Sequence, residues 1–339
     1  MRPQRFKTRI TELFGIRHPI VAGGLMWLAD ANYVAAVVNA GGMGFITAKT
    51  FPEEGRFEAE LDKAATLTGG KPFGVNLYMS NRPEQNKDLP AQLEVALDKG
   101  VRHFETAGLP PTEFVERIKD AGGVVFHKVA TVKHAISAVS KLPIDAVAVV
   151  GAECGGHPGL NLIGSIVQIP LAVQRLEVPV LVGGGIGTGS QIAAALAMGA
   201  DAVLLGTRFL VATEIWSHDL IKQRVVDAQE TDTALVLASL RNTFRGIDNA
   251  TTRAIADLEK QGVTAFDAYR PYVMGTLQKE AYTVGDPEKG ILSMGQACVF
   301  ADKIEPVEAI MDRLVDEAVA ASGRLGGLMA ADAESAAAE

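Results

Sequence analysis

The fold class that this sequence predicts is α/β: a TIM (β/α)8 barrel with a small helical domain inserted after strand 8. Three observations predict it. Short apolar runs recur over residues 18–209, amphipathic segments separate them, and the runs do not alternate between apolar and polar residues. Half-exposed antiparallel strands alternate, so these continuous runs indicate parallel strands that are buried on both faces.

The apolar runs number eight, which is the count that closes an α/β barrel. The expected strands are residues 18–24, 43–48, 73–79, 103–108, 124–130, 146–153, 178–185 and 202–209. The clearest helices between them are expected at residues 31–39, 90–98, 112–121, 131–141 and 189–198. An open doubly wound sheet is the alternative, and it would bind a ligand in one crevice instead of across a ring of loops.

The pattern changes after residue 209. A helix-rich region without a further barrel-like strand runs to about residue 282, and residues 305–321 have the period of one long helix. We therefore expect a barrel domain of residues 1–213 and 298–330, and a mainly helical roof domain of residues 214–297. The alanine-rich residues 331–339 are expected to be a disordered tail.

Composition excludes several classes of partner. Lys and Arg total 32 against 40 Asp and Glu, and no basic block occurs, so neither nucleic acid nor a membrane surface is an expected partner. Cys154 and Cys298 have no zinc-binding spacing, and no metal site is expected. Neither a signal peptide nor a membrane span is expected, and the two cysteines suit a reducing compartment, so we expect a cytoplasmic protein.

Glycine-rich turns follow the two last predicted strands. The first turn is VGGGIGTG (residues 182–189) and the second is LGTRF (residues 205–209). Barrels commonly hold a phosphate between the loops after strands seven and eight, where backbone N–H groups approach the anion. The turns predict a phosphate site at Gly183, Gly184, Gly185, Gly206 and Thr207, although glycines also occur where a turn is merely sharp.

Other predicted strand ends meet at the same face of the barrel. The small residues Gly23 and Gly24, followed by Leu25 and Met26, would admit a flat ring close to the backbone after strand one. Two polar residues accompany them, Asn76 in strand three and Lys128 in strand five. Asn76 could bind a polar ring edge or be a satisfied buried amide, and Lys128 could neutralise an anion or extend to solvent.

A histidine lies on a glycine-flanked loop after the sixth predicted strand. The segment is ECGGHPG (residues 153–159), which places His157 at the rim where barrel enzymes carry their active sites. Imidazole titrates near neutrality, so it can accept a proton from a carbon acid or hold an anionic substrate. His157 is the candidate catalytic base, and Cys154 beside it is expected to be a packed thiol.

Motifs along nearly the whole chain resemble those of the nitronate monooxygenases, formerly called 2-nitropropane dioxygenases. They are HPIVAGGLMW (18–27), NAGGMGFI (39–46), KPFGVNL (71–77), ECGGHPG (153–159), GGGIG (183–187), GTRF (206–209) and SLRNTFR (239–245). The resemblance implies a flavin mononucleotide (FMN) over the carboxyl ends of the strands. It implies FMN contacts from residues 24–26, Asn76, Lys128, Gly184, Gly185, Gly206 and Thr207, with His157 matching the family's catalytic histidine.

The resemblance implies an FMN-dependent oxidoreductase but leaves its substrate open. A nitronate monooxygenase oxidises alkyl nitronates with O2 to a carbonyl compound and nitrite. Some similar proteins look like NADH:quinone reductases, which would use NADH as a transient electron donor and a quinone as acceptor. Flavin-dependent enoyl reductases share the barrel as well. In this chain Leu160, Asn161 and Leu162 follow the HPG segment where the quinone reductase branch often has acidic residues.

Overall fold

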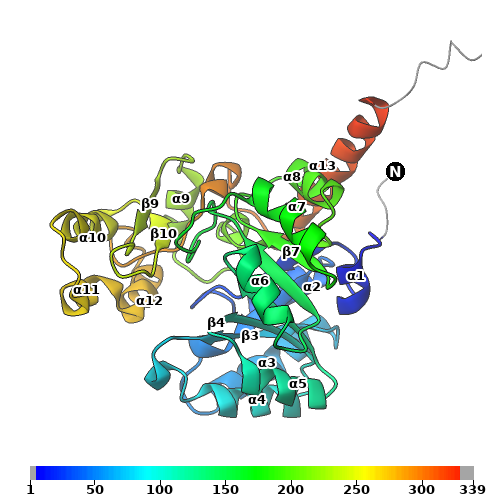
Figure 1. Ribbon diagram of the computed structural model, residues 1–339, viewed down its shortest axis with the longest axis horizontal. Coiled ribbons are helices and arrows are strands. Elements are labelled where there is room, and N and C mark those ends of the chain that lie inside the picture. The colour runs from blue at the N-terminus through cyan, green and yellow to red at the C-terminus, as the bar shows by residue number, and fades with distance from the viewer. Residues whose placement is uncertain (1–4, 329–339) are drawn as a thin grey trace, which may run out of the picture.

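The structure, a computed structural model, describes residues 5–328 and contains a closed barrel of eight parallel strands in sequence order. Residues 250–284, yellow to orange in Figure 1, lie to one side of the barrel. The barrel closes because β1 pairs with both β2 and β8, with Ile20 opposite Val203. The strands are β1 (Ile20–Ala22), β2 (Met43–Thr47), β3 (Gly74–Met79), β4 (His103–Gly108), β5 (Val124–Val129), β6 (Ala146–Val150), β7 (Val180–Gly183) and β8 (Ala202–Leu205). The predicted TIM barrel is confirmed.

Several strands are shorter than the sequence predicts, and their ends explain why. The predicted strand 178–185 ends at Gly183, because Gly184 and Gly185 adopt φ values of +94° and +73°, outside the extended region. The predicted strand 202–209 ends at Leu205, and a short 3-10 helix, η3 (Thr207–Phe209), follows it. The residues that were expected to extend these two strands therefore form loops at the carboxyl end of the barrel.

Helices surround the barrel and fill the positions between consecutive strands. They are α2 (Ala31–Asn39), α3 (Arg56–Thr68), α4 (Leu89–Asp98), α5 (Thr112–Asp120), α6 (Val132–Val139), α7 (Ser165–Arg175) and α8 (Gly189–Ala197). The long helix α13 (Val307–Leu328) packs against α8 and α2 and so takes the eighth position. It extends beyond the expected residues 305–321. Within the described range, no helix is both long and apolar enough to cross a membrane.

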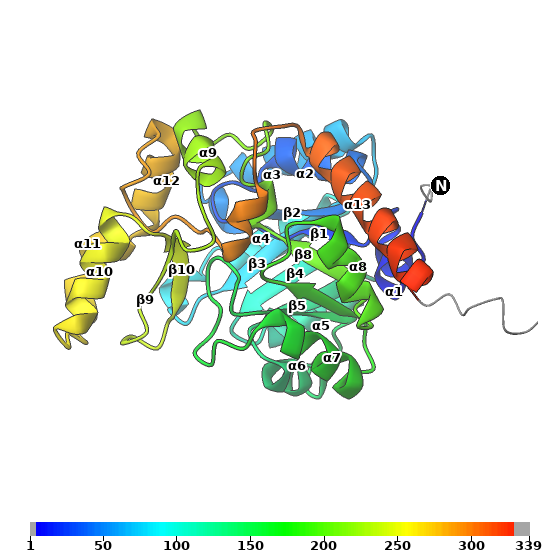
Figure 2. The same cartoon turned by 90° about the horizontal axis from the view of Figure 1, so that it is seen from above.

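An N-terminal helix closes the end of the barrel away from the predicted site. In α1 (Arg9–Phe14) the side chain of Phe14 is 1% exposed, and its ring centroid lies 6.3 Å from Phe45 and 6.1 Å from Phe126. These residues belong to an apolar cluster within the barrel. The insert elements gather at the opposite end from α1 (Figure 2). One end of the barrel is therefore plugged, and ligands must enter from the other.

The insert after β8 contains a β-hairpin that the sequence analysis did not foresee. Strands β9 (Thr233–Val236) and β10 (Phe244–Ile247) pair antiparallel. The helices of this region are α9 (Asp219–Val226), α10 (Ala250–Lys260), α11 (Phe266–Val273) and α12 (Gly275–Val284), and a 3-10 helix, η4 (Gln296–Phe300), leads back to the barrel. Four-residue strands are too short to give a period that distinguishes them from helix.

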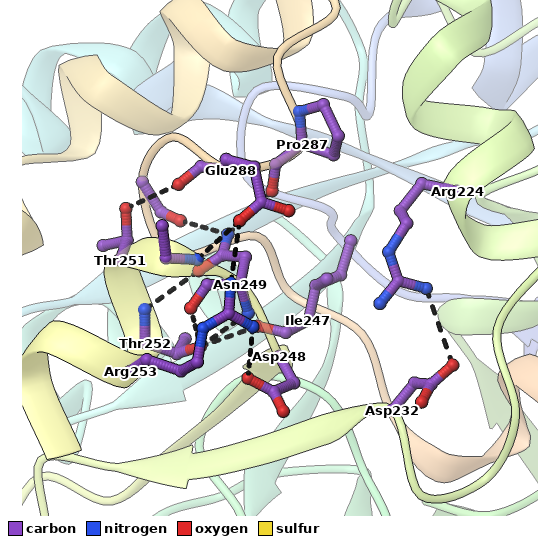
Figure 3. A network of polar contacts seen from close by, with 12 residues as sticks. Arg224, Asp232, Ile247, Asp248, Asn249, Thr251, Thr252, Arg253, Pro287 and Glu288 are labelled. Atoms are coloured by element: carbon purple, nitrogen blue, oxygen red, sulfur yellow. Dashed lines mark hydrogen bonds and ion pairs between the residues drawn. The ribbon is translucent and has the colours of Figure 1, made fainter.

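A buried asparagine joins α10 to the turn after α12 (Figure 3). The Asn249 side chain accepts a hydrogen bond from the backbone N–H of Thr252 at 2.9 Å, which caps the helix. Its amide nitrogen donates to the carbonyl oxygens of Pro287 at 2.8 Å and Gly290 at 3.0 Å. The oxygen and the nitrogen of this buried amide both have hydrogen-bond partners, and these hydrogen bonds fix the position of α10 against the turn.

Candidate active site

One large cavity opens at the carboxyl end of the barrel, between the strand ends and the insert. Its volume is about 1250 Å³. Every predicted site residue lines it: Gly23, Gly24, Leu25, Met26, Asn76, Lys128, His157, Gly183, Gly184, Gly185, Gly206 and Thr207. The β9–β10 hairpin and helices α11 and α12 contribute walls, among them Phe244, Tyr272 and Gln278. Residues separated by more than 200 positions in sequence thus surround one space.

The turns after β7 and β8 have the features of a phosphate cradle. Within residues 5–328, the backbone N–H groups of Gly184, Gly185 and Gly206 donate to no protein acceptor. A Cβ at Gly184 would lie 2.9 Å from the backbone nitrogen of Gly151. Backbone N–H groups without acceptors beside glycines suit an oxyanion, because nothing blocks its approach. These residues therefore fit the phosphate of FMN.

The carbonyl groups of the β7 turn have side-chain hydrogen-bond donors within reach. Ser165 Oγ has one proton and three acceptors within reach, the carbonyl oxygens of Gly184 at 2.8 Å and Gly183 at 3.1 Å and the Glu153 carboxylate at 3.0 Å. The Glu153 carboxylate accepts hydrogen bonds from the backbone nitrogen of Ser165 at 3.0 and 3.1 Å. Gln191 Nε2 donates to the Gly185 carbonyl oxygen at 2.7 Å. The turn is preorganised, with its carbonyl oxygens already occupied.

A buried ion pair lies beneath the loop that follows β1. Glu105 of β4 is fully buried, and its Oε1 lies 2.5 Å from Lys128 Nζ of β5. Its Oε2 accepts a hydrogen bond from the backbone nitrogen of Gly24 at 2.6 Å. The lysine side chain is 25% exposed, toward the cavity. Glu105 therefore positions both the Gly24 backbone and the Lys128 ammonium group, which were two of the predicted flavin contacts.

Close packing around Gly24 leaves no room for a side chain there. A Cβ at Gly24 would lie 2.5 Å from Asn76 Cβ and 2.8 Å from Thr47 Oγ1. The Asn76 amide is 3% exposed, lines the cavity and forms no side-chain hydrogen bond in the described chain. Buried amides normally have partners, so Asn76 is available to bind a polar ring edge such as that of a flavin.

The loop carrying His157 is clamped by the insert. Gly156 donates to the Arg245 carbonyl oxygen at 2.9 Å and accepts from the Arg245 backbone nitrogen at 2.7 Å, so the loop continues the β10 edge. The Arg245 guanidinium donates to the Ala152 carbonyl oxygen at 3.2 Å. The His157 ring meets Phe244 edge to face, with centroids 5.0 Å apart. The insert thereby fixes the orientation of the predicted catalytic residue.

His157 faces the cavity as a neutral imidazole. Removal from bulk solvent by the cavity walls, followed by the positive charge of Lys128, lowers its pKa to about 4. Desolvation disfavours the charged form even though the ring surface is open to the cavity. At neutral pH the ring therefore presents one N–H donor and one nitrogen lone pair to a ligand.

The remaining predictions near the site concern the cysteine and metals. Burial is the largest cause that raises the pKa of Cys154 to about 12, so the thiol is protonated at neutral pH and is a poor nucleophile. Among the described residues, no group of three or more His, Cys, Asp or Glu side chains could hold a metal ion.

Several residues that shape the site were not predicted from the sequence. Glu105 carries a signal that could have revealed it, because an acidic residue within an apolar buried run needs a partner. Trp27 has φ +70° and accepts a hydrogen bond at its carbonyl oxygen from Trp216 Nε1 at 2.7 Å, which joins the β1 loop to the segment before α9. Neither the φ value of Trp27 nor its contact with Trp216 can be predicted from the sequence.

Comparison with known proteins gives consistent matches along the chain. The family model for nitronate monooxygenase matches residues 7–317. A (3aS,4S,5R,7aS)-5-hydroxy-7a-methyl-1-oxo-octahydro-1H-indene-4-carboxyl-CoA dehydrogenase of Rhodococcus jostii is 30% identical, over 96% of this chain and 99% of that protein. FabK of Thermotoga maritima superposes with a TM-score of 0.86 at 29% identity, over 96% and 100% of the two chains. A nitroalkane oxidase of Streptomyces ansochromogenes superposes with a TM-score of 0.80 at 26% identity, over 93% and 99%.

Proposed function

Because the chain belongs to the nitronate monooxygenase family, we propose that it is an FMN-dependent oxidoreductase that oxidises alkyl nitronates with O2 to a carbonyl compound and nitrite. One observation carries the proposal. A phosphate cradle with free backbone N–H groups and a neutral, firmly held His157 line the same cavity. A flavin anchored in the cradle would lie in the same cavity as a substrate that contacts His157.

The residues present suit FMN along its length. Gly184, Gly185, Gly206 and Thr207 would hold the phosphate, and the backbone of residues 23–26 would lie along the ring system. Asn76 would bind a polar edge of the ring, and Lys128 would place a positive charge beside it. FMN bound here would supply the redox chemistry, because it accepts electrons from an organic substrate and passes them to O2.

His157 would orient the substrate. As a neutral imidazole, it can donate one hydrogen bond to an oxygen of the nitro group, and its other nitrogen can accept the Cα proton of a neutral nitroalkane. A nitronate has already lost that proton, so its oxidation needs only the orienting role. Contacts with Phe244 and Gly156 hold the ring and its loop against the insert.

A second candidate function is oxidation or reduction of a larger, CoA-linked substrate. The cavity of about 1250 Å³ is larger than the roughly 300–1,000 Å³ of ordinary ligand pockets, so it has room beyond FMN and a small nitronate. The Rhodococcus relative is named as a dehydrogenase of a carboxyl-CoA compound. An NADH:quinone reductase, with NADH as transient donor, is a further expectation of the sequence resemblance.

Nitrite release and O2 uptake with ethylnitronate test the proposal. The FMN-loaded protein should release nitrite without NADH, and His157→Asn should lower kcat/KM by about 10- to 100-fold, the usual size of one orienting hydrogen bond to a charged group. His218→Asn is the matched control, because His218 is exposed, lies outside the cavity lining and caps α9 in a way that Asn can reproduce, so the rate should be unchanged. Absence of nitrite from the native protein would refute the proposal.

A further inference from the structure

A nitronate carries a negative charge, so its binding requires a cationic partner in the cavity. Lys128 and His157 do not provide an unpaired positive charge. Lys128 is paired with Glu105 at 2.5 Å, and His157 is neutral because its pKa is about 4. Arg82 lies over the Phe266 ring of α11 at 3.9 Å, and Lys141 and Arg241 are exposed to solvent. Among the cavity-lining cations, Lys49 is half-buried and has no carboxylate partner in the described part of the chain.

The position of Lys49 places it beside the predicted flavin contacts. It lies in the 3-10 helix η1 (Ala48–Thr50), two residues after Thr47 of β2. Thr47 Oγ1 donates to the carbonyl oxygen of Leu25 at 3.3 Å, and Thr50 Oγ1 accepts from the backbone nitrogen of Trp27 at 3.1 Å. Hydrogen bonds on both sides of Lys49 thus tie its backbone to the β1 loop that would cover the ring system.

The ammonium group of Lys49 is held in place without being neutralised. Its Nζ donates to Asn86 Oδ1 at 3.0 Å and lies 4.9 Å from the centre of the Tyr78 ring. Asn86 is itself fixed, because its amide nitrogen donates to the Ser80 carbonyl oxygen at 2.7 Å and its Oδ1 accepts from the Ser80 backbone nitrogen at 2.9 Å. An ammonium group has three donors, so this arrangement leaves donors free for an anion.

Burial of this group has a cost that a bound anion would offset. Desolvation lowers the pKa of Lys49 to about 8, and no neighbouring charge contributes to the shift. Structural lysines usually reach solvent or pair with a carboxylate. Lys49 instead keeps a positive charge inside the cavity at neutral pH, with an amide oxygen and an aromatic face as its only recorded partners in the described residues.

We propose that Lys49 binds the anionic group of the substrate, a planar oxyanion of the nitronate type, as a charge-assisted hydrogen-bond donor. The identity of the substrate rests on the proposed function, whereas the anion site itself rests on the geometry. Asn86 and Tyr78 act as positioning residues that aim the ammonium group. Lys49 would then hold the substrate's charge while His157 orients its reactive end.

Nitrate, a planar oxyanion, is the probe for this site, and calorimetric titration of the FMN-loaded protein is the measurement. Lys49→Met should weaken nitrate binding by about 10- to 100-fold, the usual size of one hydrogen bond to a charged group. Lys49→Arg should retain binding within a few-fold. Lys141→Met removes an exposed cation at the cavity rim and is the matched control, expected to leave the affinity unchanged. Lys49→Gln replaces Lys49→Met if that variant does not fold.

Steady-state kinetics separate this inference from the proposed function. With ethylnitronate, Lys49→Met should raise KM with a smaller change in kcat. Nitrate affinity that is unchanged in Lys49→Met, or absent from the native protein, would overturn the role of Lys49. Nitrate binding that depends on Lys49, in a protein that does not oxidise ethylnitronate, would refute the proposed function and support the anion site.

Discussion

Replacing Lys128 by Met tests whether Glu105 needs its ion pair. Glu105 is fully buried, and among the described residues the substitution would leave its carboxylate with only the Gly24 backbone N–H, 2.6 Å from Oε2. Removing one partner of a buried ion pair typically costs about 3–5 kcal/mol of unfolding free energy, because the remaining charge is uncompensated. We expect a loss in this range.

The double variant Glu105→Gln/Lys128→Met is the matched control. It removes both charges while keeping an amide oxygen for the Gly24 N–H, and replacing a buried pair by neutral groups is often close to neutral. We expect the double variant to be more stable than Lys128→Met by about 2 kcal/mol or more, a coupling typical of residues in contact. Urea unfolding of the apoprotein measures this difference without a contribution from bound FMN. Equal destabilisation in the single and double variants would refute the role assigned to the pair.

Three further predictions concern the same site. Gly24→Ala should lower the flavin content of the purified protein strongly, because its Cβ would lie 2.5 Å from Asn76 Cβ; an unchanged FMN-to-protein ratio would contradict this. On the acid side, the kcat/KM for nitroethane, whose Cα proton His157 would accept, should show no inflection near pH 6.5, the ordinary pKa of histidine, and should fall only as the pH approaches about 4. On the alkaline side, the kcat/KM for ethylnitronate should fall as Lys49, with a pKa of about 8, loses its proton. Cys154, with a pKa of about 12, should react slowly with a thiol reagent at pH 8 in the folded protein and rapidly after unfolding; fast labelling of the folded protein at Cys154 would contradict the burial argument.

Much of the barrel could be predicted from the sequence because its strands are buried on both faces. Runs such as residues 146–150 and 202–205 are apolar throughout, and each proved to be a barrel strand. The insert was harder to predict. Its hairpin, β9 and β10, uses strands of four residues, and the burial of β9 is partial and irregular, so no clear period is present.

The candidate site also has residues that the sequence predicts and residues that only the folded structure reveals. Glycines that require positive φ or close backbone approach, such as Gly184 and Gly24, occur at strand ends, where the sequence makes them visible. Lys49 could not be singled out, because its importance depends on where Asn86 and Tyr78 hold its ammonium group. The clamp between Gly156 and Arg245 joins segments about 90 residues apart and becomes apparent only in the folded chain.

The most direct test of the central claim is anaerobic stopped-flow mixing of the FMN-loaded protein with ethylnitronate and, separately, with NADH, while flavin absorbance is followed. The proposed function predicts that ethylnitronate bleaches the flavin rapidly and that NADH does not. Rapid bleaching by NADH together with no response to ethylnitronate would contradict it, and would identify the protein as a reductase that uses NADH as its electron donor.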